Sequence, residues 1–313
     1  MMLYREALAH SLLTAMQADP KTLCLGVGVA DPKGIFGTCK AAHDAYPERV
    51  IETPLSETML TGALTGLALN GYKPVFVHAR ADFLTLSMEH LINTAAKWNA
   101  SHRRKGPLPI VVRAIIGRGW GQGPQHSQSM FKALSGIPGL RVISPVTIDD
   151  ALRSVPESLD SGVPTVILEP RRLYETELCW ARFERPLANI VTIGDIALNA
   201  IEAQACLERQ GVRVNVWPLV DSARLWGYSS AAPLVVCETG HGDADGLLAD
   251  LATRPHGRII RVSPPNCPCP TSAELERQWY PSAADIVSAV GESLGLDLTS
   301  DIKRPADAFR GPF

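Results

Sequence analysis

The stretch RVIETPLSETMLTGALTGLALNGYKPVFVHA (residues 49–79) predicts a strand, a helix and a second strand in succession. Its first residues are rich in β-branched side chains and end at Pro54, after which Ser56 suits the N-cap of a helix over residues 57–69. Asn70-Gly71 suits the end of that helix, and the apolar run that follows predicts the second strand. A strand–helix–strand unit favours parallel pairing, so we expect an α/β fold.

The same alternation continues on both sides of this stretch. Further strands are predicted at residues 22–30, 109–116, 141–144 and 165–169, and helices at 5–17, 84–99 and 149–159. Strands that alternate with helices in this way are typical of a domain with a mainly parallel sheet.

The pattern breaks around residues 180–186, and a second α/β block follows. Its strands are predicted at residues 190–193, 213–218, 234–238 and 258–262, and its helices at 197–209, 245–253 and 282–294. The final residues are polar and contain two prolines, which predicts a tail. We therefore expect one domain over 1–183, a smaller one over 184–296, and a tail over 297–313.

Composition excludes several classes of protein. Of the 313 residues, 46% are hydrophobic and 20% charged, which is usual for a soluble globular enzyme. The net charge of −2 argues against a nucleic-acid binder, since neutralising phosphates requires a basic excess. No apolar run is long enough to span a membrane, and we expect no secretory signal at the start. The odd number of cysteines, seven, favours reduced thiols and a cytoplasmic location.

A glycine-rich loop follows one predicted strand. In IIGRGWGQGPQHSQ (residues 115–128) every second residue from Gly117 to Gly123 is glycine, and such a loop can bring backbone amides close to a ligand. The spacing fits neither the dinucleotide fingerprint nor a P-loop. His126 ends the loop, where loops gather at the carboxyl ends of parallel strands. A functional role and a purely structural role for this histidine both stay open at this point.

Two further features could carry chemistry. Glu57 lies in the first turn of the predicted helix, where a carboxylate either offsets the helix dipole or meets a ligand in a cleft. Cys267 and Cys269 could suggest a metal site, but there is no second such pair and no nearby histidine, so no metal site is predicted.

Five stretches, in this order, resemble a known family. They are PERVIETPLSE (47–57), TGALTGLALNGYKPV (61–75), ADFLTLSMEHLINTAAKW (81–98), QHSQS…GIPGLRVISP (125–145) and LEPRRLY (168–174). Together they closely resemble the beta subunit of the thiamine-diphosphate-dependent decarboxylase component of 2-oxo acid dehydrogenase complexes. This is the pyruvate, branched-chain and acetoin dehydrogenase group of the transketolase superfamily. The resemblance is dense over residues 1–175 and traceable from 188 to 296.

The resemblance implies a pyrimidine-binding α/β domain followed by a smaller transketolase C-terminal-type α/β domain. It implies that Glu57 contacts the aminopyrimidine ring of thiamine diphosphate and favours the imino tautomer, which can take the thiazolium carbon proton. Phe83 matches the aromatic residue that packs on the pyrimidine, and Leu55 is expected in the same pocket. His126 matches the family histidine near the reacting carbon, where it handles a substrate carboxylate or a proton.

The resemblance also implies a partner. In this family the diphosphate and its Mg²⁺ are held by a Gly-Asp-Gly…Asn motif on an alpha subunit, and this sequence has no such motif. The resemblance therefore implies an active site shared between two kinds of chain in an α₂β₂ heterotetramer. The family uses the helix that carries Gly62 and Gly66 here at subunit contacts.

Two departures from the family pattern bear on function. An acid pair that usually follows the first strand is replaced by Val27 and Gly28, and the stretch WPLVDSARLWG (217–227) replaces a motif of the C-terminal domain. The second departure bears on attachment to a lipoyl acyltransferase core.

Three hypotheses about function follow. In the first, the chain is the beta subunit of an enzyme that decarboxylates a pyruvate-like 2-oxo acid and transfers the resulting acyl or hydroxyalkyl group. In the second, the same cofactor chemistry joins that group to an aldehyde, ketone or sugar without a lipoyl partner. In the third, the chain is a non-catalytic regulatory paralogue.

Overall fold

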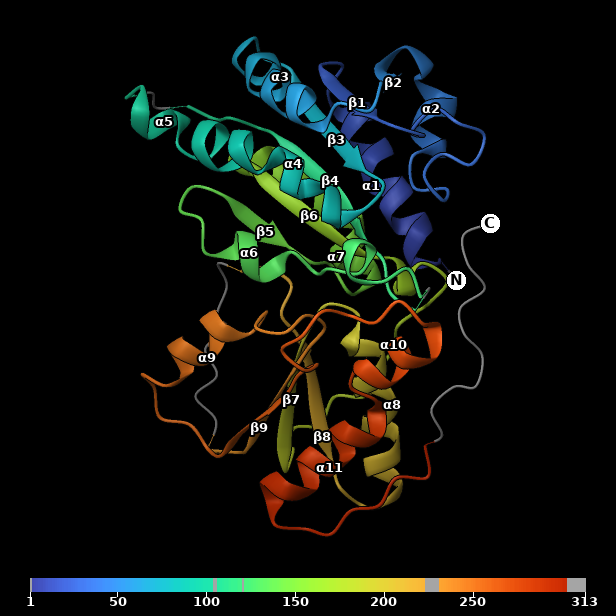
Figure 1. Cartoon of the computed structure of the whole chain (residues 1–313), viewed down its shortest axis with the longest axis vertical. Helices are drawn as coiled ribbons and strands as arrows, with labels where there is room; N and C mark the ends of the chain where they lie inside the picture. The colour runs from blue at the N-terminus through green and yellow to red at the C-terminus, as the bar shows by residue number, and fades with distance from the viewer. Residues whose placement is uncertain (1, 104–105, 120, 223–230, 303–313) are drawn as a thin grey trace. The chain divides into compact units, whose positions relative to one another are not determined.

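The computed structural model describes residues 2–103, 106–119, 121–222 and 231–302 (Figure 1). Contacts divide the chain into two compact units. The first contains residues 1–116, 133–177 and 221–223, and the second contains residues 117–132, 178–220 and 224–313. The glycine-rich loop is thus grouped with the second unit. The domain bounds at 183/184 and 296/297 stay predictions.

The first unit is built on a six-stranded sheet in which every neighbouring pair is parallel. In sheet order the strands are β2 (Val50–Glu52), β1 (Thr22–Gly26), β3 (Lys73–His78), β4 (Val111–Ile116), β6 (Thr165–Pro170) and β5 (Arg141–Ile143). This sheet confirms the predicted α/β class.

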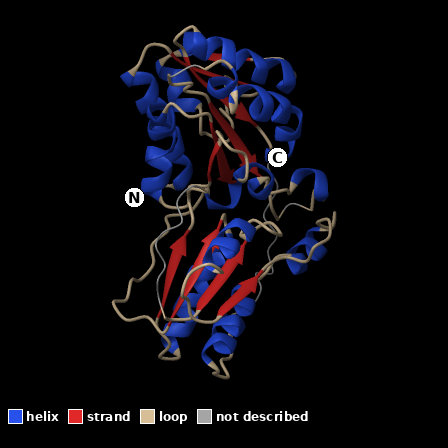
Figure 2. Cartoon of the chain, turned by 90° about the vertical axis from the view of Figure 1, so that its left-hand side faces the viewer, coloured by secondary structure: helices blue, strands red, loops and turns tan. Residues whose placement is uncertain are grey.

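Helices flank this sheet on both faces (Figure 2). They are α1 (Tyr4–Ala18), α2 (Lys40–Ala45), α3 (Glu57–Leu69), α4 (Leu84–Glu89), α5 (Trp98–Ser101) and α7 (Ile148–Ser161). Helix α1 packs against α7, and α3 packs against α4. A short helix, α6 (Phe131–Ser135), follows the glycine-rich loop.

Two predicted elements differ from the structure. The helix expected over 84–99 is interrupted by a π-helical segment, His90–Ala95, after which the N–H of Ala96 donates to the carbonyl of Leu91, five residues earlier. The strand expected over 22–30 ends at Gly26. The chain turns away there because the Glu52 carboxylate accepts from the amides of Gly28, at 2.5 Å, and Ala30, at 3.1 Å.

A buried ion pair joins two central strands of the first unit. Arg113 on β4 and Glu169 on β6 are both fully buried. The guanidinium donates to the carboxylate through Nε and through Nη2, the latter at 3.1 Å, and the hydroxyl of Tyr174 donates to the same carboxylate at 2.9 Å. Burial raises the pKa of Tyr174 well above its usual value, with the charge of Glu169 adding to the effect. This network therefore satisfies its charges internally.

The second unit has a four-stranded parallel sheet with one main helical layer. The strands in sheet order are β10 (Ile259–Val262), β9 (Leu234–Glu238), β7 (Ala188–Ile193) and β8 (Val214–Pro218). Helices α8 (Ile196–Arg209) and α11 (Ala283–Leu294) pack side by side against it (Figure 1). Two shorter helices, α9 (Asp245–Leu251) and α10 (Ala273–Trp279), complete the unit.

The start of the predicted tail lies against the second unit. Leu298 and Ile302 pack on its apolar core, and Asp301 accepts from Arg209 of α8 at 3.0 Å. Residues 303–313 of that prediction lie outside the described residues.

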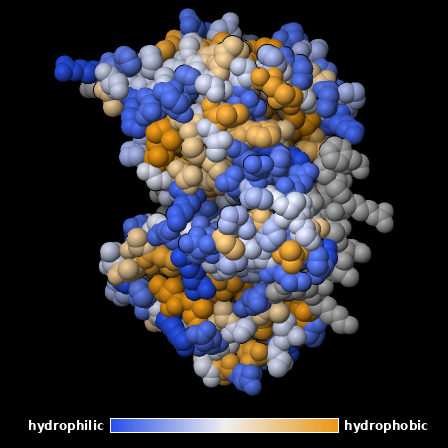
Figure 3. All heavy atoms as spheres, viewed as in Figure 1, coloured by the Kyte–Doolittle hydropathy of each residue, from blue (hydrophilic) through white to orange (hydrophobic). Residues whose placement is uncertain are grey.

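The surface and the thiols are unremarkable for a globular chain. Polar and apolar side chains are interspersed over the face that Figure 3 shows. All seven cysteines are free thiols. Within the described ranges, no helix combines the length and apolar character that crossing a bilayer requires.

We predict that breaking the Arg113–Glu169 pair from one side is costly, because it leaves a buried charge without its partner. Arg113→Met should lower the free energy of unfolding by about 3–5 kcal/mol. The control is Arg153→Met on α7, since Arg153 is 60% exposed in its ion pair with Glu157 and should contribute under about 1 kcal/mol. Urea unfolding of the full chain checks both, and equal costs for the two variants would contradict the assignment.

Candidate active site

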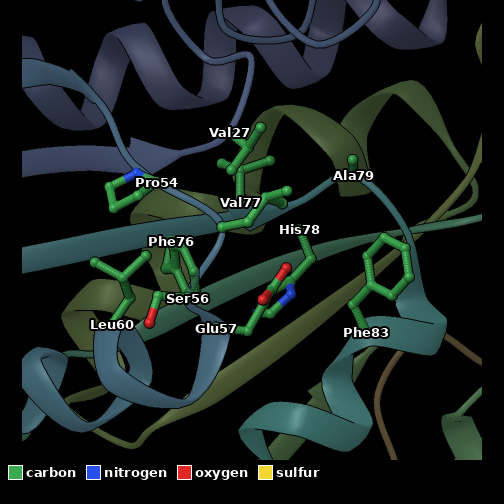
Figure 4. Close-up of a pocket in the computed structure, with 11 residues that line it drawn as sticks. Val27, Pro54, Ser56, Glu57, Leu60, Phe76, Val77, His78, Ala79 and Phe83 are labelled. Atoms are coloured by element: carbon green, nitrogen blue, oxygen red, sulfur yellow. The ribbon is translucent and has the colours of Figure 1, made fainter.

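A hollow lies at the carboxyl ends of β1 and β3, beside the first turn of α3 (Figure 4). The empty space within it and at its open mouth amounts to about 340 Å³. Its lining residues are Val27, Pro54, Leu55, Ser56, Glu57, Leu60, Phe76, Val77, His78, Ala79 and Phe83. All of them belong to the first unit. The carboxyl edge of a parallel sheet is where open α/β folds bind ligands, so this is the candidate site.

Glu57 is the first residue of α3, and a sharp corner from Pro54 to Ser56 delivers it to the hollow. Ser56 occupies the N-cap position, but its side chain makes no cap hydrogen bond. The Glu57 side chain is half-buried and projects into the hollow (Figure 4). A carboxylate here benefits from the positive end of the helix dipole, and it is also free to meet a ligand.

Two apolar side chains accompany Glu57. Phe83 ends a 3₁₀ turn, Ala81–Phe83, and presents its ring to the hollow (Figure 4). Leu55 lines the same hollow, yet 76% of its surface is exposed. A large aliphatic side chain left this open at the edge of a pocket is suited to cover an apolar ligand surface. The structure therefore brings together three of the four predicted site residues: Leu55, Glu57 and Phe83.

His126 belongs to the second unit. It ends a 3₁₀ turn, Pro124–His126, which is grouped with the second unit, and it is not among the residues that line the hollow. Its main-chain N–H donates to the carbonyl of Gly123 at 3.2 Å.

The amides of the glycine-rich loop have a partner that the sequence did not reveal. The N–H groups of Gly119 and Gly121 donate to the carboxylate of Glu276, at 2.6 and 2.5 Å, and Glu276 is fully buried on α10. Gly121 has a φ of +66°, and a Cβ there would lie 2.7 Å from the nitrogen of Ala273. These two amides therefore hold the loop against α10, rather than a ligand, which the sequence pattern had allowed.

Sequence reasoning missed one polar residue of the hollow. His78 is the last residue of β3 and is only 3% exposed. Its Nε2 lies 3.3 Å from the hydroxyl of Ser87, and its ring meets the ring of Phe76 edge-on at 4.6 Å. Burial lowers the pKa of His78 to about 4, so the ring is neutral at pH 7. The available signal was a lone histidine at the end of an apolar strand.

Val27 lines the hollow at a position where the resemblance implies an acidic residue. The ionisable side chains among the lining residues are therefore Glu57 and His78. The rest of the wall is aliphatic or aromatic. A mostly apolar hollow with few polar groups suits a flat heteroaromatic ring, so the residues present fit the pyrimidine moiety of thiamine diphosphate. Among the described residues, no cluster of His, Cys, Asp or Glu side chains could hold a metal ion.

The chain is similar to characterised enzymes of one family. Residues 1–177 match the family described as transketolase, pyrimidine binding domain. The beta subunit of acetoin:2,6-dichlorophenolindophenol oxidoreductase from Cupriavidus necator is 28% identical, over 92% of this chain and 96% of that protein. The mitochondrial pyruvate dehydrogenase E1 component subunit beta-1 of Arabidopsis thaliana is 30% identical, over 92% of this chain and 88% of that protein.

Two solved structures share the fold. A split-gene transketolase, described as an inactive beta4 tetramer, superposes with a TM-score of 0.67 at 21% identity, over 94% of this chain and 99% of that one. Transketolase from Leishmania mexicana gives a TM-score of 0.71 at 18% identity, over 96% of this chain and 47% of that one. The chain therefore belongs to the transketolase pyrimidine-binding family and, within it, to the beta subunits of thiamine-diphosphate-dependent 2-oxo acid dehydrogenases.

Proposed function

We propose that this chain is the beta subunit of a two-chain thiamine-diphosphate enzyme that decarboxylates a pyruvate-like 2-oxo acid and transfers the resulting acyl or hydroxyalkyl group. The observation that carries the proposal is the placement of Glu57, Phe83 and Leu55 around one hollow at the start of α3. The relatives named above, a pyruvate dehydrogenase and an acetoin oxidoreductase subunit, support the reaction class.

Each of the three residues has a role that follows from its chemistry. The Glu57 carboxyl would hold a ring nitrogen of the pyrimidine through a hydrogen bond and would exchange a proton with it. Phe83 and Leu55 would contact the same ring through their apolar side chains and would exclude water from it. When bound, the cofactor supplies an electron sink for the charge left by loss of CO₂.

His126 is proposed as the residue that handles a substrate carboxylate or a proton beside the reacting carbon. Support comes from its loop, whose amides at Gly119 and Gly121 are fixed by the buried Glu276. The hydroxyl of Tyr280 also donates to the carbonyl of Ser127, the residue after His126, at 3.3 Å. A loop held at Gly119, Gly121 and Ser127 is suited to keep the imidazole of His126 in place.

A second chain is proposed to hold the diphosphate and Mg²⁺, in an α₂β₂ heterotetramer. Support comes from the exposed face of α3, the helix that begins with Glu57. Met59 is 58% exposed on it, and Gly66, about two turns further along the same face, has no atom within 4 Å of where a Cβ would be. An apolar face with an uncovered glycine allows the close approach of another helix.

The acyl acceptor distinguishes the first hypothesis from carboligation. Two departures from the family pattern favour carboligation: Val27 lines the hollow where the family has an acid, and residues 217–227 replace a motif of the C-terminal domain. Residues 217–222 of the second departure lie within the described chain, whereas residues 223–227 lie outside it. Product analysis with pyruvate, with and without a lipoyl protein, decides between transfer to lipoamide and joining to a carbonyl compound. The intact set of Leu55, Glu57 and Phe83 argues against a non-catalytic paralogue.

Glu57→Gln should abolish most of the activity of the enzyme reconstituted with its alpha chain. Loss of the carboxyl removes the proton-transfer partner of the ring, so kcat should fall by roughly 10²- to 10⁴-fold with the melting temperature unchanged. Glu48→Gln is the matched control, because Glu48 is 68% exposed outside the hollow. Full turnover by Glu57→Gln would refute the assignment of this residue.

The chain on its own should bind thiamine diphosphate weakly or not at all, because the diphosphate groups lack their Mg²⁺ site. Isothermal calorimetry with and without a chain that carries the Gly-Asp-Gly…Asn motif measures this. Binding should be restored when that chain is added. Tight binding by the isolated chain would rule out the shared site.

Gly66→Leu should prevent association with the alpha chain and leave the fold intact. The added side chain has open space in this chain, and leucine favours a helix over glycine by up to about 1 kcal/mol. Gly246→Leu on α9 is the control, since a Cβ there also meets no atom within 4 Å. Analytical ultracentrifugation of the mixed chains gives the result, and equal association by both variants would exclude this face of α3 from the interface.

A further inference from the structure

His78 is the ionisable residue of the hollow that has no role in the proposed function. It ends β3, and its side chain projects into the same hollow as the carboxylate of Glu57 (Figure 4). With 3% of its surface exposed, it is almost completely removed from solvent within this chain. A polar ring kept in such a place requires hydrogen bonds to offset the cost of burial.

A chain of hydroxyl groups fixes one side of the ring. The hydroxyl of Thr61 donates its one proton to the hydroxyl oxygen of Ser87 at 2.7 Å, and the carbonyl oxygen of Glu57 lies 2.7 Å from the same hydroxyl. The Ser87 side chain is fully buried, so its own proton needs an acceptor, and Nε2 of His78 lies within reach at 3.3 Å. Ser87 therefore donates to Nε2.

This direction of donation determines the tautomer. A neutral imidazole carries one proton, and if Nε2 accepts, the proton is on Nδ1. Among the described residues, Nδ1 has no protein hydrogen-bond partner. The low pKa of about 4, caused by burial, keeps the ring uncharged at neutral pH. The free side of the ring is thus an uncharged N–H donor.

We infer that His78 is a second ligand-contacting residue of the hollow, which donates Nδ1–H to an acceptor nitrogen of the pyrimidine ring packed against Phe83. The inference rests on the proposed function, because it assigns His78 to the same bound ring as Glu57. The two residues then play different parts. Glu57 supplies a carboxyl that exchanges a proton, and His78 supplies a donor that keeps its proton.

The hydroxyl chain gives this assignment a geometric basis. Thr61 stands one turn after Glu57 on α3, and its hydroxyl contacts link the start of that helix to Ser87 on α4 and so to His78. The orientation of the imidazole is therefore coupled to the helix that carries the carboxylate. A ring seated in the hollow would meet both groups in fixed directions.

The test uses two substitutions of His78 that differ only in the donor. His78→Leu removes it and keeps an apolar side chain of similar size, whereas His78→Asn places an amide N–H near the position of Nδ1. In the enzyme reconstituted with its alpha chain, the dissociation constant of thiamine diphosphate should rise about ten- to a hundredfold in His78→Leu. In His78→Asn it should stay within about fivefold of the parent. Calorimetry measures both, and a thermal melt of each chain reports on the fold.

A direct measurement on the full chain complements the binding data. Nitrogen NMR of chain labelled with ¹⁵N-histidine, with His78→Asn to assign the signal, should show His78 as a neutral ring protonated on Nδ1 at pH 7. A charged ring, or a proton on Nε2, would overturn the inference. So would equal cofactor affinity in the Leu and Asn variants.

The outcomes distinguish a failure of the role of His78 from a failure of the proposed function. If the parent complex binds the cofactor and Glu57→Gln is inactive, but His78→Leu binds as tightly as the parent, the role of His78 is refuted and the proposed function stands. If the parent complex does not bind thiamine diphosphate at all, the proposed function fails, and the inference falls with it.

Discussion

Parallel pairing at one edge of the first sheet is the constraint on which the candidate site depends. Gly26 of β1 pairs with Glu52 of β2 on one side and with Val77 of β3 on the other, so three strands end at the same level. A Cβ at Gly26 would lie 2.6 Å from the carbonyl oxygen of Val77, so β1 can approach β3 this closely only with glycine. The residues that follow these ends, Val27 and the corner that leads to Glu57, are consequently forced into one hollow together with His78.

The features that could be predicted from the sequence alone depend on residues close together in the chain. The alternation of strands and helices, and the corner before Glu57, depend on neighbours within a few residues, so patterns of β-branched residues, caps and prolines predict them well. Phe83 and Leu55 were predicted only through the resemblance to the family. The hydrogen bonds from Gly119 and Gly121 to Glu276 cross more than 150 positions of the chain, and no periodicity encodes them. His78 was missed because its hydrogen-bond partner, Ser87, lies on a different element, α4. The sequence pattern around His78 does not indicate this contact.

The ionisable groups of the sheet and those of the hollow differ in burial and in charge. Between β4 and β6, Arg113 and Glu169 are both buried, and each satisfies the other through paired hydrogen bonds. In the hollow, Glu57 is only half-buried and His78 is neutral. Burying a neutral imidazole costs far less than burying an ion without a partner. The hollow can therefore remain apolar enough to receive an uncharged ring.

The position of Glu57 links cofactor binding to assembly in the proposed function. The carboxylate is the first residue of α3, and the exposed face of that same helix carries Met59 and Gly66. A partner that packs on this face would restrict the motion of the helix, and with it the direction of the carboxylate at its N-terminus. Since binding of a ligand and binding of a partner to one rigid element must favour each other when both need the same orientation, the two equilibria are thermodynamically coupled. In the proposed function, the part of the site on this chain would therefore bind its cofactor more tightly after the second chain has associated.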